Sequence, residues 1–421
     1  MQTKKTHLPS ILILFVFAVS ALCLMLILFG IGISSVVDLF SDTGDPAGEM
    51  ISAMAFGFEL LILFLCAWFV FQKTRGNERA DLPFKFPYSE WQIFAMLGMT
   101  IFAVLLGAGI ALIGIKWLSW IFLPILTLFV IVPPIWLLFG IGTKGIALGP
   151  RWQVFSALGI GLTIGPVIMI VLEVVVLLGI VIIGVVAIAI QQPALLDELI
   201  TLGEVIQQET NQDVILKLLA PYIGNPFVIA SIVGYIALIV PLIEELFKPL
   251  AVWIFARKIE TPAQGFALGM LSGAAFALIE SLNASGDGSA TWPLIVSIRA
   301  GTSLLHMTTS GLVGWGIASA FREKKIARLV GAYLSAVTLH GIWNACAVGT
   351  GISSIGEFIG KPEWAFNIIP AALCGMAVLG IGMLAVLIAS NRKLRSASAS
   401  SLAALPAPQI NENNKSEEDV K

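Results

Sequence analysis

Charged residues are scarce in this chain of 421 residues. They make up 12% of it, about half of the share in soluble domains, whereas hydrophobic residues reach 58%. The net charge of −2 gives no basic surplus, so we expect no nucleic-acid partner. Four cysteines occur, all inside apolar runs, and their spacing suits neither a metal site nor an extracellular disulfide framework. The His-Glu-x-x-His pattern of many zinc proteases is absent as well.

Long apolar runs are abundant, and they predict an all-α, polytopic transmembrane helical bundle. Each run is long enough to cross about 30 Å of hydrocarbon at about 1.5 Å per residue. The fifth run is overlong, which leaves a tilt, a break at Pro166 or an interfacial continuation open. The predicted spans, about ten, lie near 11–37, 50–72, 91–115, 118–142, 152–190, 227–256, 263–283, 292–320, 329–350 and 368–390.

The distribution of lysine and arginine predicts the orientation of these spans. With the N-terminus in the cytoplasm, 17 Lys and Arg residues flank the spans on that side. The opposite side has only Lys116, Lys217 and Lys361. Since positive charge collects on the cytoplasmic side, both termini are expected there, with an even number of spans.

Composition divides the chain into five predicted regions. A five-span region at 1–190 precedes an acidic extracytoplasmic connection at 191–226, where Leu195, Leu199, Leu202 and Ile206 indicate an amphipathic helix. Polar residues concentrate in the next region, 227–350. A loop and final span follow at 351–395, and the Ser-, Asn- and Glu-rich tail at 396–421 has the composition of a disordered segment.

The sixth run contains Glu244, Glu245 and Lys248 within five residues. An ionisable group at membrane depth costs roughly 2.5–3.5 kcal/mol on insertion scales, so such groups are functional candidates by default. Glu244 and Lys248 are four apart on a helix and are predicted to form a structural ion pair. Glu245 then points about 100° away and is predicted to face a cavity.

Further polar residues interrupt the next three runs. The rise of a helix gives the depth of each polar residue in its span. Except for Arg299, these residues lie with Glu244 and Glu245 in one layer, roughly 18–25 Å from the cytoplasmic flanks of their spans. Arg299 lies nearer the outer interface, where it is expected to pair with Glu280 or with a loop acid. The residues of these runs are Glu280, Arg299, His306, His340 and Asn344.

Carboxylate and imidazole in a nearly dry site suit the activation of water. A buried glutamate is a general base, and histidine with asparagine can hydrogen-bond a developing oxyanion. The same groups are normal zinc ligands, so a metal site remains open. The alternative is a proton-coupled transporter with a Glu/His/Lys relay, although only Glu59 and Glu173 are comparable in the first half. A non-catalytic scaffold is the third hypothesis.

The order and spacing of these motifs resemble those of the PrsW intramembrane proteases, relatives of the CAAX prenyl endopeptidases and bacteriocin-processing proteases. The resemblance covers about residues 230–348. Its second motif has glutamate where the CAAX endopeptidases have histidine, and Ser281 follows where asparagine is expected. The matching motifs are Glu244-Glu245-x-x-Lys248, Phe276-x-x-x-Glu280, His306 and His340-x-x-Trp343-Asn344.

This resemblance implies a multi-pass, bacterial-type cell-membrane endopeptidase. Its substrate would be a membrane protein or peptide, for example a single-span anti-sigma factor. The resemblance leaves metal dependence open, with zinc as the candidate ion and Glu245, Glu280, His306 and His340 as candidate ligands. The predicted catalytic residues are Glu244, Glu245, Glu280, His306, His340 and Asn344.

Overall fold

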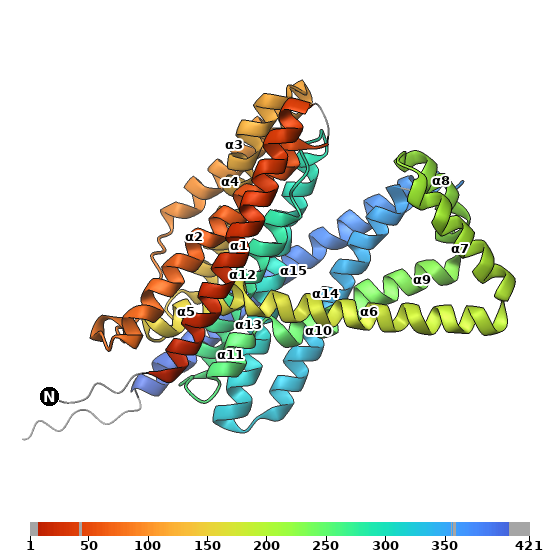
Figure 1. The fold of residues 1–421 in the computed structure, drawn as a ribbon. Helices are drawn as coiled ribbons and strands as arrows, with labels where there is room; N and C mark the ends of the chain where they lie inside the picture. Colours follow the sequence, from red (N-terminus) through yellow and green to blue (C-terminus); the bar gives the residue numbers. More distant parts are fainter. Residues whose placement is uncertain (1–6, 42–43, 355, 357–358, 404–421) are drawn as a thin grey trace, which may run out of the picture.

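The computed structural model describes residues 7–41, 44–354, 356 and 359–403, and within these ranges the chain is a bundle of α-helices (Figure 1). The described residues contain no β-strand, only an isolated bridge between Pro83 and Pro150. The first half comprises α1 (Leu8–Ser41), α2 (Pro46–Thr74), α3 (Trp91–Ile113), α4 (Lys116–Thr143), α5 (Arg151–Leu162) and α6 (Ile164–Gln191). The second half comprises α7 (Pro193–Gln208), α8 (Gln212–Ile223), α9 (Pro226–Gly234), the π-helical turn η2 (Tyr235–Ile239), α10 (Val240–Phe247), α11 (Leu250–Phe255), α12 (Pro262–Asn283), α13 (Trp292–Glu323), α14 (Ile326–Ser354) and α15 (Glu363–Ala403).

Nine helical segments of the described chain are long and apolar enough to cross a membrane. They correspond to nine of the ten predicted spans, so the prediction of a polytopic helical bundle is confirmed. The remaining predicted span, 292–320, forms α13, a helix of 32 residues whose serine, threonine and histidine content lowers its hydropathy. Most of those polar residues are buried against other helices instead of facing outwards.

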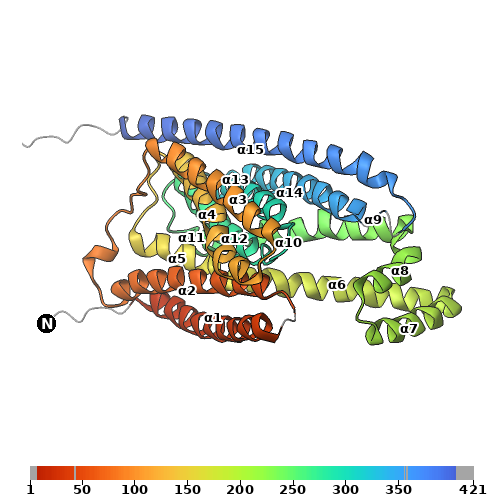
Figure 2. The ribbon, with the colours of Figure 1, turned by 90° about the horizontal axis from the view of Figure 1, so that it is seen from above.

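Helix α13 packs against both α12 and α14, and these helices form the centre of the molecule (Figure 2). Small residues allow α12 and α13 to approach closely: a Cβ at Gly273 would lie 2.3 Å from the carbonyl oxygen of His306. The backbone of Gly269 similarly faces Ser310, and that of Gly265 faces Gly314. Close packing through this glycine repeat aligns α13 antiparallel to α12.

The overlong fifth run is broken rather than continuous. Helix α5 ends at Leu162, and α6 begins at Ile164 after a non-helical Thr163 (φ −128°, ψ −89°). Pro166 explains the break, because its ring conflicts with a helical carbonyl four residues earlier and it lacks an N–H. Beyond the break, α6 extends away from the bundle, and α7 and α8 lie at its far end in both views (Figures 1 and 2).

The amphipathic helix indicated by Leu195, Leu199, Leu202 and Ile206 is α7, and a second helix, α8, follows it in the same connection. The turn at 209–211 separates them, and the hydroxyl of Tyr222 on α8 donates a hydrogen bond to Glu198 on α7. The start of α1 and the end of α15 lie at the same end of the bundle, as an even number of spans requires (Figure 2). The predicted tail at 396–421 begins inside α15, which continues to Ala403, and residues 404–421 lie outside the described ranges.

The N-terminal helices are attached to the central ones by buried polar contacts. Glu59 on α2 is 2% exposed and accepts a hydrogen bond from Asn283 at the end of α12, at 3.0 Å. Trp292, at the start of α13, donates from Nε1 to Thr127 on α4, also at 3.0 Å. These contacts fix the first half of the chain against α12 and α13.

Candidate functional site

Four helices bring the predicted ionisable residues together in the interior. Helix α10 supplies Glu244 and Glu245, and Lys248 follows at its C-terminal end. Helices α12, α13 and α14 supply Glu280, His306 and His340. The exposed fraction of Glu245 is 0%, and those of Lys248, His306 and His340 are 2% each. Groups of this kind remain buried in apolar surroundings only when they are paired with one another.

Proline distorts the helix that carries the two adjacent glutamates. Pro241 follows the π-helical turn η2, and Pro249 separates α10 from α11, so Lys248 lies at a helical break. Proline cannot donate to the carbonyl of the preceding turn, and π-helical turns often occur at functional sites. The carboxylates are therefore held on a short helix of eight residues with an irregular turn at each end.

The ammonium group of Lys248 lies at the centre of the cluster. Its Nζ is 2.8 Å from Oε2 of Glu244 and 2.8 Å from Oε1 of Glu245. The same nitrogen is 2.9 Å from Nδ1 of His306 and 3.3 Å from Nδ1 of His340. The predicted Glu244–Lys248 pair is present, but Lys248 bridges both carboxylates and both imidazoles.

The two glutamates differ in exposure, in the opposite sense to the prediction. Glu245 is fully buried and lies 2.8 Å through Oε1 from Nδ1 of His340. The side chain of Glu244 retains 11% exposure, and its Oε2 lies 3.7 Å from Nε2 of His340. Glu244, rather than Glu245, is thus the more accessible carboxylate, because α10 turns Glu245 towards α14.

A second carboxylate–histidine pair lies on the α12–α13 side of the cluster. Oε2 of Glu280 is 2.5 Å from Nε2 of His306, and its Oε1 is 2.9 Å from Nη2 of Arg299. Arg299 also donates to the backbone carbonyl of Glu280 at 3.2 Å. The expected Arg299–Glu280 pair is therefore present, and it fixes the carboxylate that contacts His306.

Each histidine has one nitrogen against a glutamate. The contacts are satisfied when His340 donates its Nδ1 hydrogen to Glu245 and His306 donates its Nε2 hydrogen to Glu280, an assignment made from the hydrogen-bond network. The other nitrogens, Nε2 of His340 and Nδ1 of His306, then carry lone pairs. A glutamate behind each imidazole fixes its tautomer and the orientation of its ring.

Asn344 makes a backbone contact that was not predicted. Its amide nitrogen donates to the carbonyl oxygen of Ile236 in η2, at 3.0 Å. That carbonyl lies five residues before Pro241, which has no N–H to satisfy it. One hydrogen of the Asn344 amide therefore stabilises the distorted backbone, and the oxyanion role of its second hydrogen stays a prediction.

Two residues beside the cluster are not among the predicted site residues. Tyr333 on α14 donates its hydroxyl to the carbonyl of Leu242 at 2.7 Å, which ties α14 to α10. Glu173 on α6 is half-buried and lies within electrostatic range of Glu244 and Glu280. Its carbonyl accepts a hydrogen bond from Tyr235 at 2.8 Å. The sequence feature that could have indicated a role for Glu173 is its position as an isolated carboxylate in an apolar span.

The side chains present suit a divalent metal ion. Glu244, His306 and His340 offer one ligand atom each, and these atoms all lie within 4.8 Å of one another. Carboxylate and imidazole are usual zinc ligands, and Glu245 and Glu280 occupy the outer positions expected behind ligating histidines. Oε2 of Glu245 is a buried oxygen with no hydrogen-bond partner among the described residues. Compared with the predicted ligand set, Glu244 replaces Glu245, and Glu280 is not part of the group.

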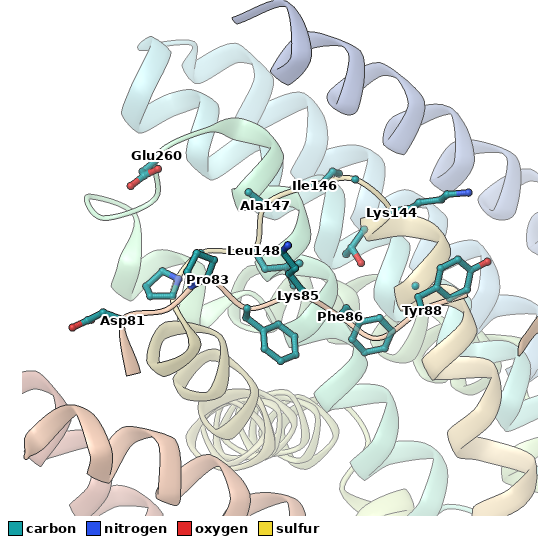
Figure 3. Close-up of a pocket in the computed structure, with 16 residues that line it drawn as sticks. Asp81, Pro83, Lys85, Phe86, Tyr88, Lys144, Ile146, Ala147, Leu148 and Glu260 are labelled. Carbon is teal, nitrogen blue, oxygen red and sulfur yellow. The ribbon is translucent and has the colours of Figure 1, made fainter. Parts of the chain in front are cut away.

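A cavity of about 770 Å³ lies elsewhere, between the loops that follow α2 and α4 (Figure 3). Its lining includes Lys85, Tyr88, Lys144 and Glu260, and none of the predicted site residues. Lys144 is paired with Glu90 at 2.6 Å. This cavity brings together no carboxylate–histidine pair, so the chemistry of the chain concentrates in the buried cluster.

A helical membrane bundle with carboxylates and imidazoles gathered in its interior belongs to the class of multi-pass membrane proteins with an intramembrane functional site. The sequence profile of the PrsW family intramembrane metalloproteases matches residues 149–360, just over half of the chain. The chain belongs to this family, as its motifs predicted. The match also includes α5 to α8, which lie outside the predicted resemblance. No curated protein and no solved structure shows significant similarity to the chain.

Proposed function

We propose that this protein is an intramembrane endopeptidase that hydrolyses peptide bonds of membrane-protein substrates. The observation that carries the proposal is the convergence of Glu244, His306 and His340 from three helices to within 4.8 Å, with Glu245 and Glu280 behind the two imidazoles. A carboxylate beside oriented imidazoles can transfer protons in both directions during hydrolysis. The family match to residues 149–360 supports the same reaction class.

Glu244 is the proposed general base. It is the more accessible carboxylate of the pair, and its Oε2 lies beside Nε2 of His340. In the proposed reaction, Glu244 takes a proton from water, the water oxygen bonds to the scissile carbonyl carbon, and the carbon–nitrogen bond then breaks. Nε2 of His340, beside Glu244, receives that proton, and the imidazolium so formed gives it to the leaving amine, which returns both side chains to their starting protonation states.

The remaining residues are proposed to orient these groups. Glu245 holds the ring of His340, whereas Glu280, itself fixed by Arg299, holds the ring of His306. In a metal-dependent form of the proposal, Glu244, His306 and His340 would instead hold a zinc ion, which would supply Lewis-acid polarisation of the carbonyl and a more acidic water, and Glu244 would act as a ligand in place of a base. Binding of one extended segment of a substrate across α10 and α14 would exclude bulk water from these groups.

The proposed location is a bacterial-type cell membrane, with both termini in the cytoplasm and the substrate reaching the site from within the bilayer. A single-span regulator such as an anti-sigma factor fits this arrangement. The experiment is cleavage of a panel of single-span proteins by the purified full chain in proteoliposomes. Wild-type protein should release defined fragments, and Glu244→Gln should release none. Fragment release by both proteins at the same rate would refute the proposal.

A further inference from the structure

The ammonium of Lys248 is surrounded by one acceptor for each of its three hydrogens. Oxygen atoms of Glu244 and Glu245 each lie 2.8 Å from Nζ, and the Nδ1 atoms of His306 and His340 lie at 2.9 and 3.3 Å. An ammonium group has three hydrogens to donate. Since Nδ1 of His340 donates its hydrogen to Glu245, the acceptors of the ammonium are the two carboxylate oxygens and Nδ1 of His306. The site therefore surrounds a cation with three acceptors, two of them anionic, as a metal site does.

Two of these acceptors belong to the group that can hold a metal ion. Oε2 of Glu244 and Nδ1 of His306 are the atoms left available when Glu280 holds the other nitrogen of His306. We propose that the ammonium of Lys248 and a divalent metal ion compete for one position between Glu244, His306 and His340. This inference rests on the proposed function, because it concerns the same donor atoms.

Nδ1 of His306 cannot serve both cations at once. An imidazole nitrogen has a single lone pair, which either accepts a hydrogen bond from Lys248 or coordinates a metal ion. A zinc–nitrogen bond is about 2.0–2.1 Å long, well inside the hydrogen-bond distance, so the ion needs the direction that Nζ occupies. Two positive charges at such short range in a buried site also repel each other.

Lys248 is held firmly in this position. Its side chain has no exposed surface, and Nζ lies 4.7 Å from the ring centroid of Phe276 on α12. Its backbone N–H donates to the carbonyl of Glu244 at 2.7 Å, immediately before the break at Pro249. Metal loading therefore requires Lys248 to leave the cluster, and the α10–α11 junction is the part of the backbone that adjusts. Lys248 is a positioning residue that also excludes metal.

The test is zinc binding to the full chain in detergent, after removal of metal with a chelator. Zinc alone is titrated by calorimetry into wild type and into Lys248→Met, which keeps the apolar stem and removes the ammonium. Lys248→Met should bind one zinc ion at least tenfold more tightly than wild type. The double variant with His306→Ala should lose that gain. Lys217→Met, on the exposed face of α8, should match wild type.

A second variant and a second measurement separate competition from misfolding. Lys248→Arg keeps a cation in the site and should remain as weak in zinc binding as wild type. Zinc should raise the melting temperature of Lys248→Met and leave that of Lys248→Arg unchanged. Equal zinc affinity in wild type, Met and Arg variants would overturn the competition, and so would the absence of zinc binding from all three. Normal zinc competition without any peptide cleavage would instead refute only the proposed function.

Discussion

Glu245 on α10 and His340 on α14 are separated by 95 positions in the chain, yet Oε1 of the glutamate lies 2.8 Å from Nδ1 of the imidazole. Both groups are buried, and the same carboxylate oxygen also pairs with Lys248 at 2.8 Å. This contact fixes His340 so that Nε2 points towards the more accessible Glu244. It gives the two adjacent glutamates separate proposed tasks, one in orienting a ring and one in moving a proton.

Removing the imidazole ring of His340 should lower kcat/KM more than neutralising Glu245, the carboxylate that holds this ring. His340→Ala is expected to lower kcat/KM by about 10²–10⁴-fold, the usual contribution of a general acid–base group. Glu245→Gln should lower it by about 10–100-fold, the usual effect of an outer partner. Initial rates of fragment release in proteoliposomes measure both. Equal losses in the two variants would contradict the separate tasks.

The Arg299–Glu280 pair should act through His306. Glu280→Gln keeps the shape of the side chain and should lower kcat by about 10–100-fold with little change in KM. Arg299→Met should have a smaller effect, because Glu280 keeps its contact with His306. The kcat and KM values of the two variants test this order. A larger loss in Arg299→Met than in Glu280→Gln would show that Arg299 contacts the substrate itself.

Asn344 should contribute to stability, and its predicted oxyanion role is tested separately. Asn344→Ala leaves the carbonyl of Ile236 without its partner, which costs about 1–3 kcal/mol for a buried group. We expect a lower melting temperature in detergent, and a lower kcat for the folded fraction only if the second hydrogen binds the oxyanion. Thermal unfolding, with activity normalised to folded protein, separates the two effects. A loss of kcat at full stability would contradict the structural contribution and support the oxyanion role alone.

The close contact of α12 and α13 should tolerate no added side chain at Gly273. Gly273→Val places its Cβ about where the carbonyl of His306 already lies, so it should destabilise the bundle by at least a few kcal/mol, as overpacking does. Gly179→Val on α6 is the matched control, since nothing lies within 4 Å of its added Cβ. The melting temperatures of the two variants should differ clearly. Equal values would mean that α12 and α13 are not in contact at this point.

Much of the fold follows from the sequence because the bilayer imposes simple rules on it. The lengths of the apolar runs predicted nine spans that the described structure contains. They also predicted a helix at α13, although polar residues are spaced along it. The sequence left a tilt, a break at Pro166 and an interfacial continuation open for the fifth run. Proline near the start of a helix is compatible with each, so the break at Thr163 was not decided from the sequence. The spacing of leucine and isoleucine predicted the helix that forms α7, whereas the separate helix α8 after residues 209–211 was not predicted.

The sequence predicted that several ionisable residues lie at one depth, and it did not predict how they contact one another. The rise of a helix placed Glu244, Glu280, His306 and His340 at one depth, and the structure brings them together. Rotation about each helix axis decides which carboxylate meets which imidazole, and tertiary packing sets that rotation. The central position of Lys248 was missed for this reason. The structural contact of Asn344 depends on the π-helical turn, which no spacing in the sequence indicates.

The central claim is that the buried carboxylate–histidine cluster hydrolyses peptide bonds. The most direct measurement is fragment release from a single-span protein by purified full chain in proteoliposomes, followed by mass spectrometry in H₂¹⁸O. The account predicts one ¹⁸O atom in the new C-terminal carboxyl group with wild type, and no fragment with Glu244→Gln or His340→Ala. Undiminished, ¹⁸O-labelled fragments from both variants would contradict it.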